Sequence, residues 1–269
     1  MNVTLIAIPA VALYFFGGLF TGLRLFAAEG NWRPTRNLGL ALGFAGLLLH
    51  GILLYQELFT VGGLNLSFFN AVSLAAWTVA GLLLVSSLTK PVENLAILAL
   101  PLAAITIILD LRFPGTHLLS EHAGWELRLH VLTSMLAYSL LTLASAQALL
   151  LAVQDNHLRR HHPGGFIRAL PPLQTMESLL FEMISLGFVL LSVALLTGFL
   201  YLEDMFAQHL VHKTVLSIVA WVTFATLLWG RYRFGWRGRK AIRWTLVGFA
   251  VLMLAYFGSK AVIELILKR

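Results

Sequence analysis

The chain of 269 residues is too apolar for a water-soluble fold. Hydrophobic residues make up 59% of it and charged residues only 12%, with a mean hydropathy of +0.84, whereas a soluble domain is about half apolar and about a quarter charged. The absence of cysteine excludes disulfides, thiolate metal sites and thioether-linked haem. The net charge of +7 is spread over short connectors between apolar runs, which is typical of membrane orientation rather than of nucleic-acid binding.

Eight apolar stretches are nearly all long enough to cross a hydrocarbon core of about 30 Å at 1.5 Å per residue. They lack the alternation of barrel strands, so the predicted fold class is all-α, a polytopic bundle of about eight transmembrane helices. We expect one integral-membrane domain over residues 1–269. The predicted spans are 5–26, 38–55, 66–88, 95–111, 129–153, 179–202, 214–229 and 241–266.

The positions of Lys and Arg predict which helix ends face the cytoplasm, because inner connectors retain these residues. With the amino terminus outside, 13 of the cations lie inside and 6 outside. We therefore expect this orientation in a bacterial inner membrane, with the lipid bilayer as the immediate partner. The inner set is Arg24, Arg33, Arg36, Lys90, Arg159, Arg160, Arg168, Arg231, Arg233, Arg237, Arg239, Lys240 and Arg243; the outer set is Arg112, Arg128, Lys213, Lys260, Lys268 and Arg269.

Two connectors are longer than the others. The outer one covers residues 110–128 and the inner one residues 154–177. The inner connector contains Pro163-Gly164-Gly165 and Pro171-Pro172, which remove backbone donors and favour turns. We predict that it is a surface loop.

Histidines are the main candidates for chemistry in so apolar a chain. A neutral imidazole ligates iron and is less costly to bury in lipid than a fixed charge. His50 lies past the midplane of the second span, and His130 lies just inside the outer end of the fifth. We predict both as ligands of a metal ion or of a haem iron. For His50, a hydrogen bond between helices is the alternative.

The remaining histidines lie in connectors. His209 and His212 are three residues apart in an outer loop, a spacing that places both on one face if the segment is helical. They are candidates for holding a cofactor, with solvated loop histidines as the alternative. His157, His161 and His162 stand among arginines on the inner side, where contact with lipid phosphates or a partner protein is expected.

Other polar patterns carry less chemistry. The sequence has no recognisable Ser-His-Asp arrangement, no phosphate loop and no series of carboxylates within the spans, so neither an enzyme nor a proton-driven pump is predicted. Asn65, Asn70 and Ser73 stand near the start of the third span. Capping of that helix is a simpler interpretation of these residues than pocket lining.

Four motifs in the second half of the chain occur in one order: residues 129–139, 170–177, 186–198, and 235–240 followed by 255–258. In this order they resemble the cytochrome c assembly protein family, which includes CcsA, CcmC and HemX-like proteins. The resemblance covers nearly the whole chain and is strongest to the YpjD-type branch of eight-helix inner membrane proteins. It implies a protein that handles haem in the bacterial inner membrane.

In that family, haem is presented outside the membrane on a tryptophan-rich loop and held by histidines. By this resemblance, His130 matches the first external haem-ligating histidine. The chain departs from the family elsewhere, because residues 208–217 replace the tryptophan-rich loop, residues 228–231 contain no histidine, and none follows Tyr256-Phe257-Gly258.

The function predicted from residues and resemblance together is haem binding, delivery or maturation without catalysis. The cofactor is haem b, bound non-covalently by His130 and His50, with His209 and His212 as further candidates, and the partner is a membrane protein of a cytochrome-maturation or haem pathway. One alternative is a non-haem scaffold or regulatory protein that docks a partner through basic inner loops such as residues 233–240. A small-solute transporter would favour paired broken spans in two related halves, which the sequence does not show.

Overall fold

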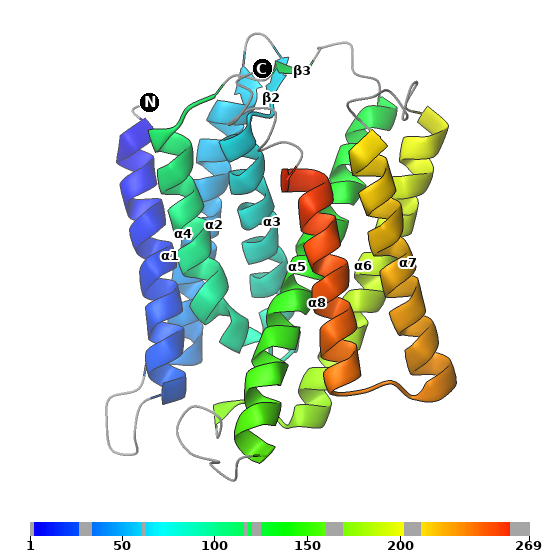
Figure 1. Cartoon of the computed structure of the whole chain (residues 1–269). Helices are drawn as coiled ribbons and strands as arrows, with labels where there is room; N and C mark the ends of the chain where they lie inside the picture. The colour runs from blue at the N-terminus through cyan, green and yellow to red at the C-terminus, as the bar shows by residue number, and fades with distance from the viewer. Residues whose placement is uncertain are drawn as a thin grey trace. The chain divides into compact units, whose positions relative to one another are not determined.

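The structure is a computed structural model, and it describes residues 3–26, 34–60, 63–115, 118–119, 125–159, 169–201 and 211–258. Within them, eight helices are long and apolar enough to span a membrane (Figure 1). This confirms the predicted all-α class and a multi-pass membrane protein. The helices are α1 (Val3–Phe26), α2 (Arg36–Leu58), α3 (Phe68–Thr89), α4 (Ala96–Arg112, preceded by the 3-10 turn η1, Glu93–Leu95), α5 (Trp125–Arg159), α6 (Leu173–Tyr201), α7 (Val211–Phe234) and α8 (Arg239–Met253, continued by the π-helical turn η3, Leu254–Gly258).

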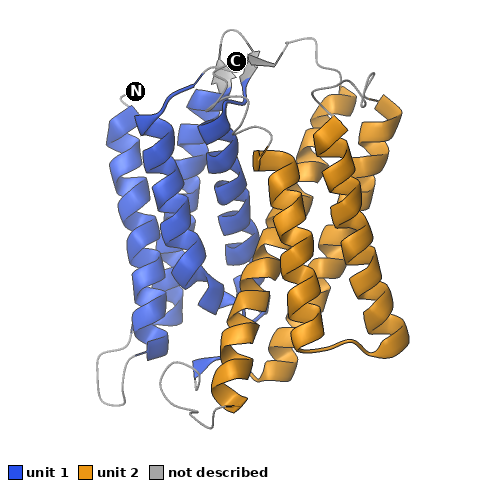
Figure 2. Cartoon of the chain, viewed as in Figure 1, with its two compact units in different colours: residues 1–122, 163–171 blue, residues 123–162, 172–269 orange. Residues whose placement is uncertain are grey.

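The helices form two compact units of four (Figure 2). Unit 1 comprises residues 1–122 with 163–171, and unit 2 comprises residues 123–162 with 172–269. In unit 1, α1 and α3 each pack against α2 and α4; in unit 2, α5 and α7 each pack against α6 and α8. Both units are therefore rings with the same order of neighbours, although the sequence contains no visible repeat. The prediction of one domain over residues 1–269 stays a prediction.

Glycines allow the close approach of α1 and α2 in unit 1. A Cβ added at Gly17 would lie 3.1 Å from the backbone nitrogen of Gly43, and one added at Gly46 would lie 2.9 Å from the ring of Tyr14. Tyr14 itself is completely buried. Small residues at a helix interface let the backbones approach. Here Gly46, one helical turn before His50, leaves room for the Tyr14 ring against α2.

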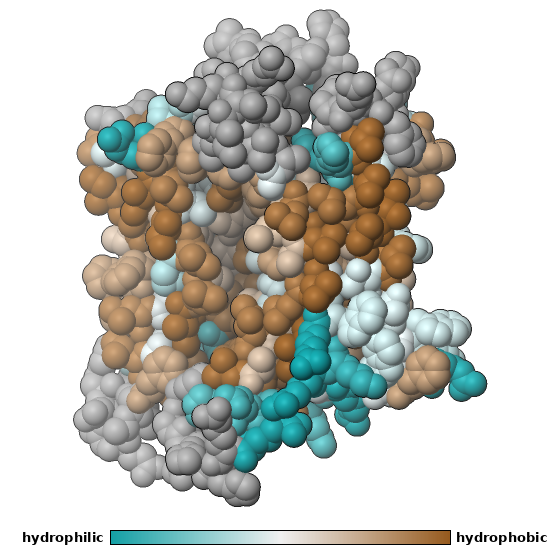
Figure 3. All heavy atoms as spheres, viewed as in Figure 1, coloured by the Kyte–Doolittle hydropathy of each residue, from teal (hydrophilic) through white to brown (hydrophobic). Residues whose placement is uncertain are grey.

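The outward-facing helix surfaces are apolar, as lipid contact requires. Leu48 in the middle of α2 is 70% exposed, and Phe199 on α6 is 69% exposed. On the face drawn in Figure 3, apolar side chains form a broad brown area along the helices, and hydrophilic side chains gather towards the helix ends. Such large exposed side chains are stable in hydrocarbon, whereas in water they would form an extensive unpaired patch.

The predicted inner loop over residues 154–177 is wrong at both ends. Helix α5 continues to Arg159 and α6 begins at Leu173, directly after Pro171-Pro172. The helices extend beyond the apolar span because acidic side chains in their terminal turns pair with other helices of unit 2: Asp155 of α5 with Arg239 of α8, and Glu177 of α6 with Arg231 of α7. Proline is also tolerated where a helix starts, since the first N–H groups lack intrahelical partners in any case.

A small antiparallel sheet, absent from the sequence prediction, joins two connectors of unit 1. Strands β1 (Phe59–Thr60), β2 (Gly63–Asn65) and β3 (Leu118–Leu119) pair in that order. The register is Phe59↔Leu64 and Thr60↔Gly63 between β1 and β2, and Leu64↔Leu119 and Asn65↔Leu118 between β2 and β3.

The expected capping of α3 by its neighbouring asparagines is not observed. The N-cap residue is Ser67, which makes no side-chain capping bond. Asn65 Nδ2 instead donates to the Gly115 carbonyl at 3.0 Å, and Asn70 Nδ2 donates to the Asn65 carbonyl at 3.2 Å. These amides therefore connect the segments around β2.

Candidate functional site

His130 lies on the second turn of α5, in unit 2, and one of its nitrogens has a defined role. Its Nδ1 is 2.9 Å from the carbonyl oxygen of Ala194 on α6, with the Thr197 hydroxyl at 3.3 Å. Because a carbonyl only accepts, Nδ1 carries the proton and donates. In the neutral ring Nε2 then keeps its lone pair, and no hydrogen bond of Nε2 occurs among the described residues. This arrangement is typical of a metal-ligating histidine, whose second nitrogen is bonded to a carbonyl or carboxylate.

Two aromatic side chains lie at the same end of α5 and α6 as His130. The ring centroids of Trp125, the first residue of α5, and Tyr201, the last of α6, are 6.0 Å apart, and both side chains are exposed. Exposed Trp and Tyr at helix ends are typical of the membrane interface. His130 therefore lies about one turn below an aromatic edge that a flat apolar ligand can contact.

His50 occupies a different environment, inside unit 1. Its side chain is almost completely buried; Nδ1 lies 3.3 Å from the Tyr14 hydroxyl and Nε2 lies 3.0 Å from the Ser73 hydroxyl. A neutral ring in which Tyr14 donates to Nδ1 and Nε2–H donates to Ser73 satisfies both contacts. His50 thus cross-links α1, α2 and α3, the arrangement that the sequence analysis held as the alternative to ligation.

Two acidic residues lie beside His50, and neither was among the residues predicted for a site. Glu57 on α2 and Asp110 on α4 line one cavity of about 10 Å³ together with His50 and Ser73. Asp110 is only 4% exposed, and its Oδ1 has no hydrogen-bond partner among the described residues. His50 and Glu57 are seven residues apart, about two helical turns, and this spacing could have predicted that both lie on the same face of the helix.

The cavity beside His50 is suited to a water molecule and not to a porphyrin. A volume of about 10 Å³ is close to the minimum that one water occupies, and the four polar groups around it can supply the two to four partners that a buried water needs. In this structure both ring nitrogens of His50 are engaged, and His50 and His130 belong to different units. The candidate haem site therefore depends on His130.

The other predicted histidines are not brought into a site. His209 lies outside the described residues, so its predicted pairing with His212 stays a prediction. His212 is the second residue of α7 and is exposed, which corrects its placement in a loop. His157, at the other end of α5, donates from Nδ1 to the Val153 carbonyl at 2.9 Å. Within the described residues, no three His, Asp or Glu side chains form a metal-binding group.

Two of the sequence motifs meet through ion pairs at the predicted inner end of unit 2. Glu177, from the motif over residues 170–177, accepts from Arg231 at 2.8 Å and from Arg237 at 2.9 Å. The guanidinium group of Arg231 also lies over the Phe181 ring, 4.5 Å from its centroid. Sequence reasoning missed this cluster because its acid and its arginines are more than fifty residues apart in the chain.

The first and last motifs also meet, through aromatic rings. Tyr138 on α5 lies 5.2 Å from Phe257 and 6.0 Å from Tyr256 on η3, and 5.7 Å from Phe249 on α8, measured between ring centroids. Such pairs contribute roughly 0.5–1.5 kcal/mol each beyond burial. The four motifs are thus positions that hold α5, α6, α7 and α8 together in one unit.

Comparison with known proteins supports the resemblance over most of the chain. The family described as "Cytochrome C assembly protein" matches residues 38–267. The inner membrane protein YpjD of Escherichia coli (strain K12) is 32% identical over 244 residues, covering 90% of this chain and 91% of that protein. An uncharacterised 28.8 kDa protein of Azospirillum brasilense is 31% identical over 261 residues, covering 94% and 86%.

A more distant relative has a name that states its process. The cytochrome c biogenesis protein CcsA of Thermosynechococcus vestitus is 26% identical over 293 residues, covering 91% of this chain and 88% of that protein. No solved structure matches the chain. Because the family match spans most of the sequence, the chain belongs to the cytochrome c assembly protein family.

Proposed function

We propose that this protein handles haem in the bacterial inner membrane, and that His130 would hold haem b non-covalently as a ligand of its iron. The inner membrane location follows from eight spanning helices and from the similarity to an inner membrane protein. Family membership and the similarity to a cytochrome c biogenesis protein support the link to haem. The protein's part is to bind haem, deliver it or assist its maturation, without catalysing a reaction.

The observation that carries the proposal is the hydrogen bond from His130 Nδ1 to the Ala194 carbonyl. It selects the tautomer whose Nε2 is free to donate its lone pair to iron, and it orients the ring. With no cysteine in the chain, attachment through thioether bonds is impossible. Haem would supply an iron centre whose redox potential depends on the ligating side chain and on the polarity of its surroundings.

Titration of haemin into the purified, detergent-solubilised protein tests the assignment. The wild type should give a sharpened Soret band. Mutation of a residue that only hydrogen-bonds to a metal ligand lowers affinity roughly 10- to 100-fold, so His130→Ala, which removes the ligand itself, should weaken haemin binding at least as much. His157→Ala is the matched control, because it removes a histidine from the other end of the same helix. A band that persists unchanged in His130→Ala, or falls equally in both variants, defeats the proposal.

The alternative, a scaffold that docks a partner through the basic inner connector, has less support. Arg231 and Arg237 are held by Glu177, and Arg239 is bonded to Asp155. Glu177 therefore engages Arg231 and Arg237 within unit 2 itself, and this pairing serves the packing of the unit. Charge reversal at Arg237 should accordingly lower the melting temperature, whereas a docking role alone would leave it unchanged.

A further inference from the structure

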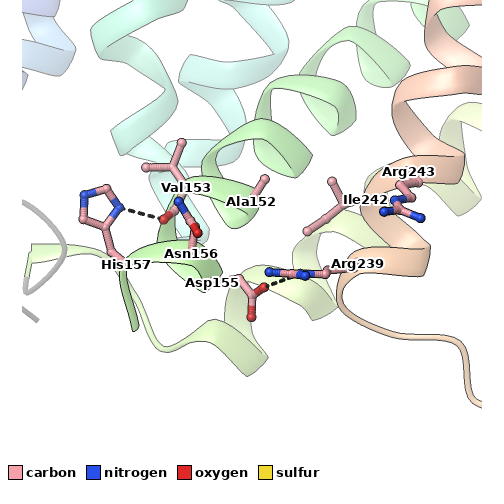
Figure 4. A pocket seen from close by; sticks show the side chains of 8 residues that line it. All are labelled: Ala152, Val153, Asp155, Asn156, His157, Arg239, Ile242 and Arg243. Atoms are coloured by element: carbon pink, nitrogen blue, oxygen red, sulfur yellow. Dashed lines mark hydrogen bonds and ion pairs between the residues drawn. The ribbon is translucent and has the colours of Figure 1, made fainter. Parts of the chain in front are cut away.

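A pocket opens between the last turns of α5 and the start of α8, at the predicted inner end of unit 2 (Figure 4). Its volume is about 440 Å³, within the range of about 300–1,000 Å³ typical of small-molecule sites. It is far from His130, which lies at the other end of α5. Among its lining residues are Val153, Asp155 and His157 from α5 and Arg239, Ile242 and Arg243 from α8.

The pocket carries an excess of positive charge. Asp155 is its acidic residue, and its carboxylate already accepts from Arg159 at 3.0 Å and from Arg239 Nε at 3.3 Å. Figure 4 shows Asp155 and Arg239 facing each other from the two helices. Arg243, one turn further along α8, forms no ion pair within the described residues. The lining thus contains two guanidinium groups and one carboxylate.

The apolar lining continues towards the middle of the membrane. Val153 and Ile242 form part of the wall. One turn further in, Leu149 on α5 is 51% exposed and Val247 on α8 is 55% exposed. Residues four apart lie on one face of a helix, so Leu149 follows Val153 and Val247 follows Arg243. The surface therefore changes from charged to apolar within about one helical turn.

Aromatic residues place the start of α8 at the membrane interface. The ring centroids of Trp236 and Trp244 are 5.6 Å apart, and Lys240 Nζ lies 5.7 Å from the Trp236 ring. Tryptophan with a neighbouring cation is typical of the headgroup level of a bilayer. At this depth, lipid phosphates are always present beside a membrane protein.

We propose that this pocket binds the phosphate headgroup of an anionic phospholipid, with Arg243 and Arg239 as the phosphate contacts and an acyl chain along Leu149 and Val247. Arginine is suited to phosphate because its guanidinium group presents paired N–H donors. Basic pockets between helices on the cytoplasmic side are known to hold such headgroups. A lipid uses both the charged and the apolar parts of this surface, whereas a free phosphate uses only the charged part.

Native mass spectrometry of the full chain in mixed micelles containing phosphatidylglycerol or phosphatidylcholine tests the proposal. Phosphatidylglycerol should be retained preferentially. Arg243→Gln should weaken its binding about fivefold, since one arginine near a lipid surface contributes about 1 kcal/mol. Arg233→Gln is the matched control, because Arg233 is an exposed cation at the end of α7 that does not line the pocket.

Three outcomes would overturn the assignment. Equal losses in Arg243→Gln and Arg233→Gln would show only general attraction between surface charge and lipid. Equal retention of the two lipids would remove the role of charge, and inorganic phosphate that binds as well as phosphatidylglycerol would remove the role of the acyl chain. Haemin binding should be unaffected by Arg243→Gln, so failure here is distinguishable from failure of the haem proposal. Melting temperatures of both variants check that they are folded.

Discussion

His50 shows how one polar side chain is accommodated inside an apolar bundle. An unpaired polar group in hydrocarbon is costly, and His50 avoids that cost by contacting Tyr14 on one helix and Ser73 on another. The glycine at position 46 is part of the same arrangement, because a side chain there would collide with the Tyr14 ring. These four residues therefore depend on each other.

Removal of the Ser73 hydroxyl should destabilise unit 1. Hydrogen bonds between membrane helices contribute about 0.6 kcal/mol on average, but a buried group left without its partner costs about 1–3 kcal/mol. We expect a loss of about 1 kcal/mol for Ser73→Ala, near the low end because water in the adjacent cavity can replace part of the contact. The measurement is the free energy of unfolding in detergent.

Thr226→Ala is the control for this variant. Thr226 on α7 is half-buried and bonds to the Val222 carbonyl of its own helix, so loss of its hydroxyl should change stability by no more than about 0.5 kcal/mol. Equal effects of Ser73→Ala and Thr226→Ala would show that the His50 contact adds nothing beyond a local helix bond.

At the scale of elements, the ends of α6 and α7 are joined by a single acid. The Glu177 side chain is 6% exposed and accepts from two arginines, one at the end of α7 and one just before α8. Beside it, Gly230 leaves room for Trp236, because a Cβ there would lie 2.4 Å from the indole ring. Three consecutive helices are thereby fixed at one end.

Glu177→Gln should therefore be more damaging than Asp155→Asn. Breaking a buried ion pair costs about 3–5 kcal/mol, and since Arg237 is 61% exposed, we expect about 2–3 kcal/mol for Glu177→Gln. Asp155 pairs with Arg159 and Arg239, whose side chains are 61% and 60% exposed, and such surface pairs contribute about 0–1 kcal/mol.

Thermal unfolding of the two variants in the same detergent measures this difference. High salt should reduce the small effect of Asp155→Asn and leave most of the effect of Glu177→Gln, because buried pairs are screened less. Equal melting temperatures of the two variants would show that the buried ion pairs of Glu177 stabilise the protein no more than the exposed pairs of Asp155.

At the scale of the whole molecule, the orientation of the helices in the membrane is still a prediction, and it decides which side of the membrane His130 faces. The count of cations favours an outer amino terminus. The two ends of α7 carry suitable markers, since His212 lies at its start and Arg233 near its end, both exposed. The proposed haem site and the proposed lipid pocket would then face opposite sides of the membrane.

Labelling of single cysteines tests this orientation, and the natural chain is already free of cysteine. In intact spheroplasts, His212→Cys should react with a membrane-impermeant maleimide, and Arg233→Cys should react only after the membrane is opened. Both sites should label equally in detergent, which controls for access. The reverse pattern in spheroplasts would place His130 on the cytoplasmic side and exclude an external haem site.

The sequence alone determined the class of the protein, the number of its helices and the family to which it belongs. These are properties of local composition: a run such as residues 179–202 is largely apolar whatever surrounds it, and the cost of exposing backbone in lipid leaves a helix as its only structure. His130 was also predictable as a candidate, because its position at the outer end of a span is a property of the chain.

Only the tertiary structure decided which polar residues meet. Glu57, Asp110 and His50 come together across α2 and α4, and Glu177 reaches Arg231 and Arg237 from another helix. No spacing in the sequence encodes these contacts between helices, because they depend on the order in which the helices pack around each ring. The same reason explains why α5 and α6 extend into a segment whose prolines and glycines predicted a loop: partners from other helices satisfy their polar ends.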